Sequence, residues 1–357
     1  IALTHIDSGI LIYHLKISQD EAHSHYGGVV PEIASRLHCQ KLPEILNKLA
    51  LFVNDDFSHI KAIAVTTRPG LSVTLIEGLM MAKALSLSLQ VPLICVNHLK
   101  GHIYSLFIRD TLPHLPKIPP YAEIQALTST QTDLESTITS HLPLGILLVS
   151  GGHTQILSMR GIDVISIIAQ SLDESFDKVA KYLGLGYPGG PLVESYAAEF
   201  MRLYPHDTPH SFPVPLLHNH QLEFSFSGLK NAVRIATLTL EKPFSQKDIG
   251  SICAGFQKSA CEHIVRKVRL FFQSNEGRDL PHFAIVGGAS ANTHLRTALA
   301  ELCKEYNKQL HLAPLAFCAD NAAMIGMAAI WQYTSNDFTP LHEAQIAPKS
   351  LPSDFCI

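Results

Sequence analysis

Short apolar runs and longer amphipathic segments alternate along the first half of the chain. The runs at 60–66 and 92–96 are bounded by turn residues and are typical of buried strands. The segments 31–51 and 71–89 carry apolar residues at helical spacing, and Pro31 stands at a first turn, where a missing N–H costs little. Because strands separated by helices are typical of a mostly parallel sheet covered on both faces, this half predicts an α/β fold. A further strand is expected at 11–18.

The second half repeats the order of strand, glycine turn and helix. LGILLV (144–149) predicts a buried strand, and the turn SGGHT leads from it into 155–159, which predicts a hairpin. Another strand is expected at 283–286. Helical patterns cover six segments: 174–182, 192–203, 229–240, 245–272, 292–306 and 321–333. Between the halves, residues 111–143 join PHLPKIPP to a Ser/Thr-rich tract, so we expect a linker or exposed insertion there.

Composition narrows the class of protein. A length of 357 residues with 46% hydrophobic residues suits two domains with sizeable cores. The net charge of 27 − 31 = −4 excludes a protein that coats nucleic acid by bulk charge, although a local patch or a second protein can still supply such contact. Seven cysteines without a CxxC pair favour a reducing compartment over a disulfide framework or a thiolate zinc site.

Two stretches of the sequence show whether a signal peptide or a membrane-spanning helix is expected. The opening residues carry Asp7 and no basic region, so they make a poor signal peptide. Glu77, Lys83 and Pro92 interrupt the apolar stretch 71–96, so we expect a helix followed by a strand, and no membrane partner. The sequence has no initiator Met, from which we expect that it begins inside a longer protein.

Three glycine-rich turns could each bind an anion through their backbone: VSGGHT (149–154), YPGGP (187–191) and IVGGASAN (285–292). Glycine permits close backbone approach, so successive N–H groups can converge on an anion, and a helix N-terminus adds a favourable dipole. Any one of these turns alone is explained equally well as a tight turn at the end of a strand, without an anion site. Three in one chain, two of them directly after strands, favour a nucleotide or acyl-phosphate site at the carboxyl ends of the strands. None fits a Walker A or GxGxxG pattern, so P-loop and dinucleotide sites are not expected.

A histidine pair offers a candidate metal site. NHLKGH places His98 and His102 four residues apart at the start of a helical pattern, where both imidazoles share one face. The residues between them supply no glutamate, so the HExxH protease pattern is absent. Asp320, at the start of the last predicted helix, is a candidate third ligand or an N-cap. With 20 histidines in the chain, chance spacing stays open beside a metal site with free coordination positions.

Several polar residues near the turns have two possible roles each, one in a binding site and one that is purely structural. Asp177 lies on a predicted helix and suits either a site or a solvated face. Glu194, one turn after YPGGP, suits either contact with ribose hydroxyls or an exposed first turn, and Asn292 either caps its helix or bonds a nucleotide. The basic residues of one long helical segment are expected on a solvated face: Lys258, Arg266, Lys267 and Arg269.

Taken together, the motifs resemble a known family. The motifs YGGVVPEIASR, TRPGL, NHLKGH, LLVSGGHTQ, ESFDKVAKYLGLGYPGGP, FSFSGLKNAV, VGGASAN and CADNAAMIG stand in the order found in the bacterial tRNA adenosine threonylcarbamoyltransferases, once misnamed O-sialoglycoprotein endopeptidases. The resemblance implies an actin-like ATPase (ASKHA) fold, with two ribonuclease-H-like domains around a nucleotide cleft. The implied parts are a domain at 1–110, a linker or insertion at 111–143, a domain with helical insertions at 144–334, and a tail at 335–357 that packs back on the first domain.

The resemblance also implies an activity, a site and partners. The activity is transfer of a threonylcarbamoyl group from threonylcarbamoyl-AMP to the exocyclic amine of the adenosine 3′ of the anticodon, in tRNAs that read codons beginning with A. The location implied for the protein is the cytoplasm. One divalent ion, iron or zinc, is implied at His98, His102 and Asp320. The partners implied are tRNA, a paralogous actin-like subunit and a small P-loop ATPase subunit. Substrate or nucleotide contacts are implied at Leu148, Val149, Ser150, Gly151, Gly152, Asp177, Gly190, Glu194 and Asn292.

The sequence departs from the family pattern in three places. The family begins with a strand and an acidic, serine-rich turn, and we expect that strand to be missing here. The segment before ESFDK is shorter than usual, and the usual double histidine is Asn97-His98. Two other functions stay open: a non-catalytic nucleotide-binding scaffold of the same complex, and a carbamoyltransferase of a different substrate or a small-molecule kinase. A metal ion argues against the scaffold, and a kinase should retain a catalytic aspartate in the cleft.

Overall fold

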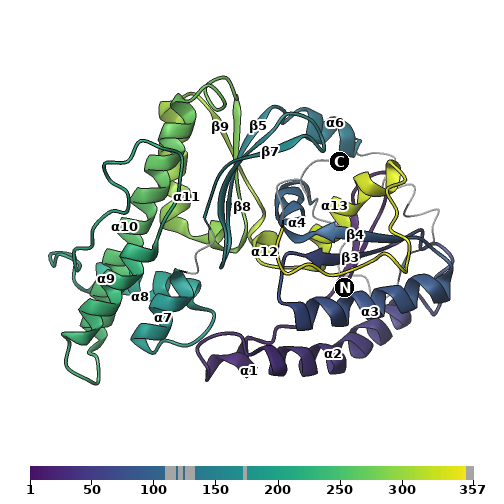
Figure 1. Ribbon diagram of the computed structural model, residues 1–357, viewed down its shortest axis with the longest axis horizontal. Coiled ribbons are helices and arrows are strands. Elements are labelled where there is room, and N and C mark those ends of the chain that lie inside the picture. The colour runs from purple at the N-terminus through teal and green to yellow at the C-terminus, as the bar shows by residue number, and fades with distance from the viewer. Residues whose placement is uncertain (109–117, 120–123, 125–132, 172–174, 351–357) are drawn as a thin grey trace.

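The computed structural model describes residues 1–108, 118–119, 124, 133–171 and 175–350. Within these ranges, helices and strands form two halves. One consists of the early residues together with α13 (Ala322–Thr334), and the other is built from residues 144–312 (Figure 1). The strands make one five-stranded sheet and two separate two-stranded sheets. The predicted α/β class is therefore confirmed.

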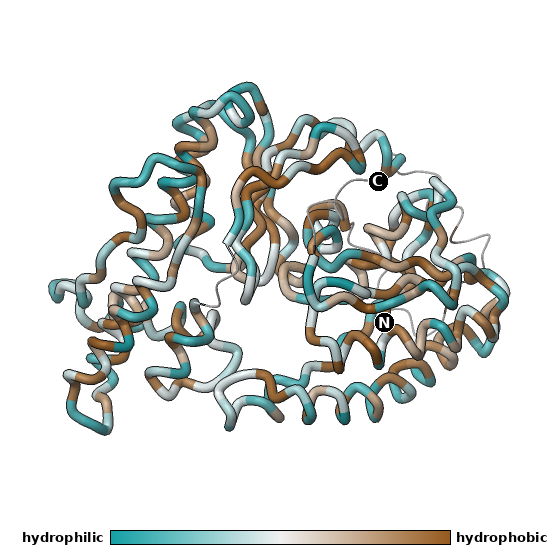
Figure 2. Tube along the Cα trace, in the orientation of Figure 1, coloured by the Kyte–Doolittle hydropathy of each residue, from teal (hydrophilic) through white to brown (hydrophobic). Residues whose placement is uncertain are grey.

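The sheet of the second half contains β5 (Leu144–Val149), β6 (Thr154–Met159), β7 (Ile165–Ser171), β8 (His282–Val286) and β9 (Gln309–Leu312). Its order is β7-β6-β5-β8-β9, antiparallel from β7 to β5 and parallel from β5 to β9. Leu147 and Val149 of β5 face one core, and Ile146 and Leu148 face the other. A strand buried on both faces needs a continuous apolar run, which LGILLV supplies. The hydrophobic colour of these strands is plain in Figure 2.

Five helices share a core with Leu147 and Val149: α7 (Phe176–Leu183), α8 (Gly189–Leu203), α9 (Ser227–Leu238), α10 (Gln246–Gln273) and α11 (Thr293–Glu305). The helices α8 and α10 pack closely because residue 250 is a glycine. A Cβ at Gly250 would lie 2.8 Å from Cβ of Phe200. Two of the five helices begin at a glycine turn: α8 at YPGGP and α11 at VGGASAN.

One basic residue of α10 contradicts the expected solvated face. Lys267 is fully buried, and its Nζ donates hydrogen bonds to the carbonyls of Asn219, at 3.0 Å, and Gln221, at 2.7 Å. Arg266 donates to the carbonyl of Leu216 at 2.7 Å. The prediction was wrong because the loop before α9 folds back over the helix, and its carbonyls replace water around the cations.

The first half contains β1 (Ala2–Thr4), β2 (Leu11–His14), β3 (Ile63–Arg68) and β4 (Leu93–Asn97), with helices α1 (Asp20–Ser24), α2 (Pro31–Phe52) and α3 (Ser72–Leu89). β1 and β2 are antiparallel, whereas β3 and β4 are parallel. The pairings repeat those of β6 with β7 and of β8 with β9. Among the residues that the structure describes, no strand joins β1 to β3 as β5 joins β6 to β8.

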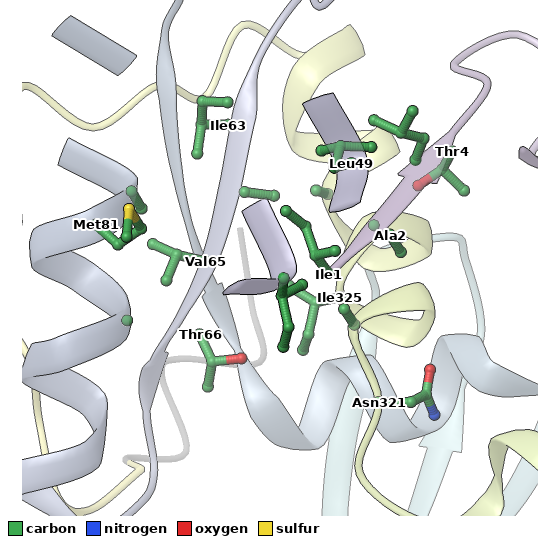
Figure 3. Close-up of a pocket in the computed structure, with 18 of the residues that line it drawn as sticks. Ile1, Ala2, Thr4, Leu49, Ile63, Val65, Thr66, Met81, Asn321 and Ile325 are labelled. Carbon is green, nitrogen blue, oxygen red and sulfur yellow. The ribbon is translucent and has the colours of Figure 1, made fainter. Parts of the chain in front are cut away.

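A cavity of about 1440 Å³ lies in this half and is lined by β1 and β3. Figure 3 shows Ala2 and Thr4 entering it from one strand and Ile63 and Val65 from the other. The lining is largely apolar and also includes His98 and Asp320. The cavity therefore separates the two small sheets and reaches the candidate metal ligands. The expectation of a missing first strand stays a prediction.

The remaining described elements are α4 (His98–Tyr104), η1 (Ser105–Phe107), α6 (Leu134–Thr139), η2 (Gly288–Ala291), α12 (Leu315–Cys318) and α13 (Ala322–Thr334). α6 falls inside the segment 111–143 that we expected to be a linker or exposed insertion. It forms because Asp133 caps its first turn and because Leu134 and Ile138 are buried. Most of that segment, and residues 172–174 before ESFDK, lie outside the described residues.

One described helix, α3, has the length and apolar composition of a membrane-crossing helix, which is weak evidence on its own. It packs against α2 and β3, with Leu75, Leu79 and Ala82 buried. Every cysteine in the described part of the chain is free.

Candidate metal centre and adjoining cleft

The helix α4 positions the two histidines predicted as metal ligands. It begins directly after β4, and the side chain of Asn97 accepts hydrogen bonds from Leu99 N, at 2.8 Å, and Lys100 N, at 3.4 Å. Asn97 is thus the N-cap of the helix, which explains an asparagine at this position. The ring centroids of His98 and His102 lie 4.7 Å apart with an interplanar angle of 77°. Both imidazoles therefore occupy one face of the helix, as their spacing predicts.

Asp320 completes the cluster from a distant part of the chain. Its Oδ1 lies 3.3 Å from Nε2 of His98 and 3.2 Å from Nε2 of His102. The N-cap of α13 is the next residue, Asn321, whose side chain accepts from Met324 N at 2.9 Å. The reading of Asp320 as the N-cap is therefore wrong, and its carboxylate is available to the histidines. Among the described residues, this is the one group of three potential ligands whose ligand atoms all lie within 4.8 Å of one another.

The protonation of the cluster suits a cation. Burial lowers the pKa of His102, and that effect outweighs the opposing influence of Asp320. Desolvation raises the pKa of Asp320, but the adjacent His102 and His98 outweigh it and hold the pKa well below its usual range. Neutral imidazoles and an ionised carboxylate are the forms that bind a metal.

The hydrogen bonding of His102 also fits a metal. The side chain is fully buried, and neither of its ring nitrogens has a hydrogen-bond partner of acceptable geometry among the described residues. A buried imidazole without partners is costly unless another group satisfies it. Two His and one carboxylate are a donor set that suits zinc or iron.

Two of the glycine turns lie side by side at the carboxyl ends of parallel strands. VSGGHT follows β5 and VGGASAN follows β8, and the two strands pair in parallel. Gly287 has φ 93°, and a Cβ there would lie 2.3 Å from the carbonyl oxygen of Val149. Only glycine fits this crossing. The structure thus brings together Val149 and the start of the VGGASAN turn, as the nucleotide-site prediction requires.

Asp177 connects the VSGGHT turn to the YPGGP turn. Its Oδ1 accepts a hydrogen bond from the backbone N–H of Gly189, at 2.8 Å, at the start of α8. A Cβ on Gly151 would lie 3.6 Å from its Oδ2. Of the two readings of Asp177, the structure therefore favours the one in which it belongs to the cluster of glycine turns. Gly190 follows directly, and a Cβ there would meet nothing within 4 Å, so the backbone at Gly190 is open.

Glu194 and Asn292 join the same region through α8 and α11. Oε1 of Glu194 accepts from the backbone N–H of Thr293, at 2.7 Å, and from its hydroxyl, at 2.5 Å. Oδ1 of Asn292 accepts from Leu295 N at 2.9 Å, so Asn292 is the N-cap of α11. Its Nδ2 donates to Gln257 at 2.8 Å. The expected capping role of Asn292 is confirmed, and both side chains tie the N-termini of the two helices to the glycine turns.

His153 is a residue of this site to which the sequence assigned no role. It closes the VSGGHT turn, with its carbonyl accepting from Ser150 N at 2.8 Å. Burial lowers its pKa, and His98 and His102 lower it further. Its position in a glycine turn directly after a buried strand was the available signal. His153 is thus part of the VSGGHT turn, and its pKa responds to the two histidines of the candidate metal site.

Comparison with known proteins identifies the family. The family model of the tRNA N6-adenosine threonylcarbamoyltransferases matches residues 11–123 and 123–327. The chain belongs to this family. A tRNA N6-adenosine threonylcarbamoyltransferase of Helicobacter hepaticus is 69% identical over 99% of this chain and 96% of its own length. Threonylcarbamoyltransferases of Helicobacter pylori strain J99 and of Wolinella succinogenes are each 48% identical, over 99% and 98% of this chain.

Membership in the threonylcarbamoyltransferase family makes the protein a transferase of the actin-like ATPase fold class. Among solved structures, it is similar to a Listeria monocytogenes protein named as a candidate N-acetylmannosamine kinase. That likeness has a TM-score of 0.36 and 13% identity over 83% of this chain and 87% of the other, which is too low to carry an argument. The assignment to the threonylcarbamoyltransferases rests on the sequence relatives and the family model.

Proposed function

We propose that this protein transfers the threonylcarbamoyl group of threonylcarbamoyl-AMP to the exocyclic amine of the adenosine 3′ of the anticodon, in tRNAs that read codons beginning with A. The observation that carries the proposal is the meeting of His98, His102 and Asp320 within 4.8 Å. The cluster lies in a member of a family whose relatives carry the name of this reaction. A scaffold without catalysis has no need of such a cluster.

The proposed reaction requires mainly that the donor and the tRNA adenosine are held in the right positions. The donor is a mixed anhydride, so its carbonyl is already activated: the adenosine amine attacks the carbonyl carbon, and AMP leaves with the electrons of the broken C–O bond. The attacking nitrogen then loses its extra proton. A bound divalent ion supplies Lewis acidity there. The chain itself holds the reactants in place, and its backbone N–H groups at the glycine turns suit an anionic phosphate.

We assign the following roles to residues within the proposal. His98, His102 and Asp320 hold one divalent ion, iron or zinc. His153 closes the VSGGHT turn that takes the adenylate. The adenylate contacts are Leu148, Val149, Ser150, Gly151, Gly152, Asp177, Gly190, Glu194 and Asn292. The hydrogen bonds of Asp177 and Glu194 to backbone N–H groups support this assignment, because they orient the helix ends around the turns.

The proposal includes two protein partners, a paralogous actin-like subunit and a small P-loop ATPase, and a cytoplasmic location. An apolar stripe on α3 supports the first partner: Val73, Ile76, Met80 and Leu87 recur on one side of the helix and are 38%, 46%, 56% and 70% exposed. Exposed apolar side chains at helical spacing are suited to a partner helix. A Met80→Glu variant should lose binding of the purified paralogous subunit while keeping its metal. Unchanged binding would remove the stripe from the proposed interface.

The proposed domain boundaries are 1–110, 144–334 and a returning tail from 335. The backbone of that tail supports its return to the first half: Thr339 N donates to Leu93 O, Ala347 N to Thr67 O, and Gly70 N to Pro348 O. Limited proteolysis should cut first within 111–133. Initial cutting inside 144–334 would overturn the boundaries.

The test of the activity is direct. The protein is incubated with threonine, bicarbonate, ATP, the partner proteins and unmodified tRNA. The tRNA is then digested, and its nucleosides are identified by mass spectrometry. We expect threonylcarbamoyladenosine with the native chain and none with His102→Ala, whose folding is checked by circular dichroism. Normal transfer by a metal-free His102→Ala variant would refute the metal role. ATP-dependent phosphorylation of a sugar, without transfer to tRNA, would favour the kinase alternative.

A further inference from the structure

Three histidines outside the proposed active site gather at the other end of the five-stranded sheet. His282 is the first residue of β8, His311 lies in β9, and His141 lies in the turn between α6 and β5. The glycine turns follow the carboxyl ends of β5 and β8, whereas His282 begins β8, His141 precedes β5, and His311 is the diagonal neighbour of His282 on β9. The cluster is therefore separate from His98, His102 and Asp320.

The sheet register places two of the rings on one face. His282 pairs with Gln309, and His311 is two residues further along β9, so the two side chains are diagonal neighbours on the same side. Nδ1 of His282 lies 3.0 Å from Nε2 of His311. Two nitrogens bound to one tetrahedral zinc ion, each at about 2.0–2.1 Å, lie roughly 3.3 Å apart. The observed separation is therefore close to that of two ligands of one ion.

The third ring is held in the tautomer that a metal ligand needs. Nδ1 of His141 lies 2.7 Å from the carbonyl oxygen of Thr137. Because a carbonyl only accepts, Nδ1 carries the proton of the neutral ring and Nε2 keeps its lone pair. A ring N–H bonded to a backbone carbonyl is the usual outer contact of a metal-binding histidine.

His141 packs over the other two rings. Its ring centroid lies 4.5 Å from that of His311 and 6.1 Å from that of His282, and Phe107 packs edge-on against it at 5.6 Å. All three histidines are half-buried, so ions in solution can reach them. Burial lowers the pKa of His282, and burial together with His141 and His282 lowers the pKa of His311 to about 4, so both rings are neutral near pH 7.

From this arrangement we propose that His141, His282 and His311 form a second metal site, for a borderline divalent ion such as Zn²⁺, Ni²⁺ or Cu²⁺. Imidazoles without a carboxylate suit these ions better than Mg²⁺ or Ca²⁺. On binding, the hydrogen bond between His282 and His311 is replaced by two N–metal bonds. One of the two rings then moves its proton to its other nitrogen. The ligand nitrogens of the three histidines do not all lie within the 4.8 Å that joins His98, His102 and Asp320. His141 therefore also shifts, together with the turn that carries it, to bring Nε2 to the ion while Nδ1 keeps its bond to Thr137. The ion connects the turn before β5 to β8 and to the edge strand β9.

The experiment measures Zn²⁺ binding to the full chain by isothermal titration calorimetry. It starts from His102→Ala, which loses one ligand of the active-site cluster. We expect this variant to retain one zinc equivalent and to melt at a higher temperature when Zn²⁺ is added. Adding His311→Ala should weaken the remaining binding by at least about 10–100-fold, the range found for lesser changes around metal ligands. The matched control is His342→Ala, which removes a histidine with an 82% exposed side chain and should leave binding unchanged.

The same His102→Ala variant loaded with Cu²⁺ should show nitrogen hyperfine coupling in its electron paramagnetic resonance spectrum, and that signal should be lost with His311→Ala. Should His311→Ala fail to fold, His141→Ala, in a half-exposed turn, gives the same readout. Absence of a zinc equivalent in His102→Ala, or binding that survives removal of both His141 and His311, would overturn the second site. Neither result bears on threonylcarbamoyl transfer, so the two proposals fail separately.

Discussion

Gly101 of α4 lies against Ile325 of α13 so closely that a Cβ on Gly101 would stand 2.8 Å from Cδ1 of Ile325. The two helices carry the metal ligands of the proposed active site, with His98 and His102 on α4 and Asp320 just before α13. The glycine therefore allows the two helices that carry these ligands to pack closely.

We predict that Gly101→Ala separates the ligands without removing any of them. Overpacking of this kind costs about 1–3 kcal/mol of stability. Metal content by atomic absorption and tRNA modification should both fall. The matched control is Gly78→Ala in α3, where a Cβ would lie 3.7 Å from its nearest neighbour and where alanine favours the helix. Equal metal content in the two variants would show that this contact does not position Asp320.

The two functions of Asn292 can be separated by two substitutions. Asn292→Asp keeps the oxygen that caps α11 but loses the amide that donates to Gln257, whereas Asn292→Ala loses both. We expect Asn292→Ala to cost about 1 kcal/mol of stability and Asn292→Asp to cost less. Both variants should lose transfer activity, the alanine variant because it has no amide and the aspartate variant because its charge also repels a phosphate. Thermal melts and the tRNA assay give the two readouts. An active Asn292→Asp enzyme would limit Asn292 to capping.

Stability of the metal-free protein should fall as the pH drops from 7.5 to 5. Burial lowers the pKa of His263 to about 4. A histidine whose pKa is lower in the folded state is protonated first in the unfolded state, so stability is lost as the pH falls below about 6.5 toward the folded value. For fully buried His263 the loss is about 2 kcal/mol at pH 5. Urea unfolding at both pH values should show a smaller pH dependence in His263→Gln, and an unchanged dependence would assign the effect to other groups.

Hydrogen exchange should differ between the two halves. β3 borders the cavity of about 1440 Å³ and, among the strands that the structure describes, pairs only with β4, whereas β5 pairs with β6 and β8 and is buried along its length. We expect amides of β1 and β3 to exchange faster than those of β5, because fewer packed neighbours lower the cost of local opening. Mass spectrometry of peptic fragments measures this difference. Equal protection of β3 and β5 would mean that the cavity does not weaken the first half.

Strong local patterns were predicted well from the sequence. The helix predicted at 31–51 is α2 (Pro31–Phe52), and the strand predicted at 144–149 is β5 (Leu144–Val149), because an apolar run or a helical period is a local signal. The short edge strand β9 (Gln309–Leu312) was missed because QLHL is brief and half exposed, so its pairing with β8 decides its structure. The helix α6 was missed because its Ser/Thr-rich sequence is typical of loops, and burial of Leu134 and Ile138 outweighs that tendency.

The sequence by itself determined the face shared by His98 and His102, because four residues are about one helical turn, and it determined the family through its motifs. Only the tertiary structure decided that Asp320 meets the histidines and that Asn321 is the cap, since 218 residues separate Asp320 from His102 (320 − 102) and the close packing of α4 on α13 brings them together. The grouping of His141 with His282 and His311 has the same origin. Local spacing fixes what one helix presents, whereas contacts between distant segments depend on how the sheets and helices pack.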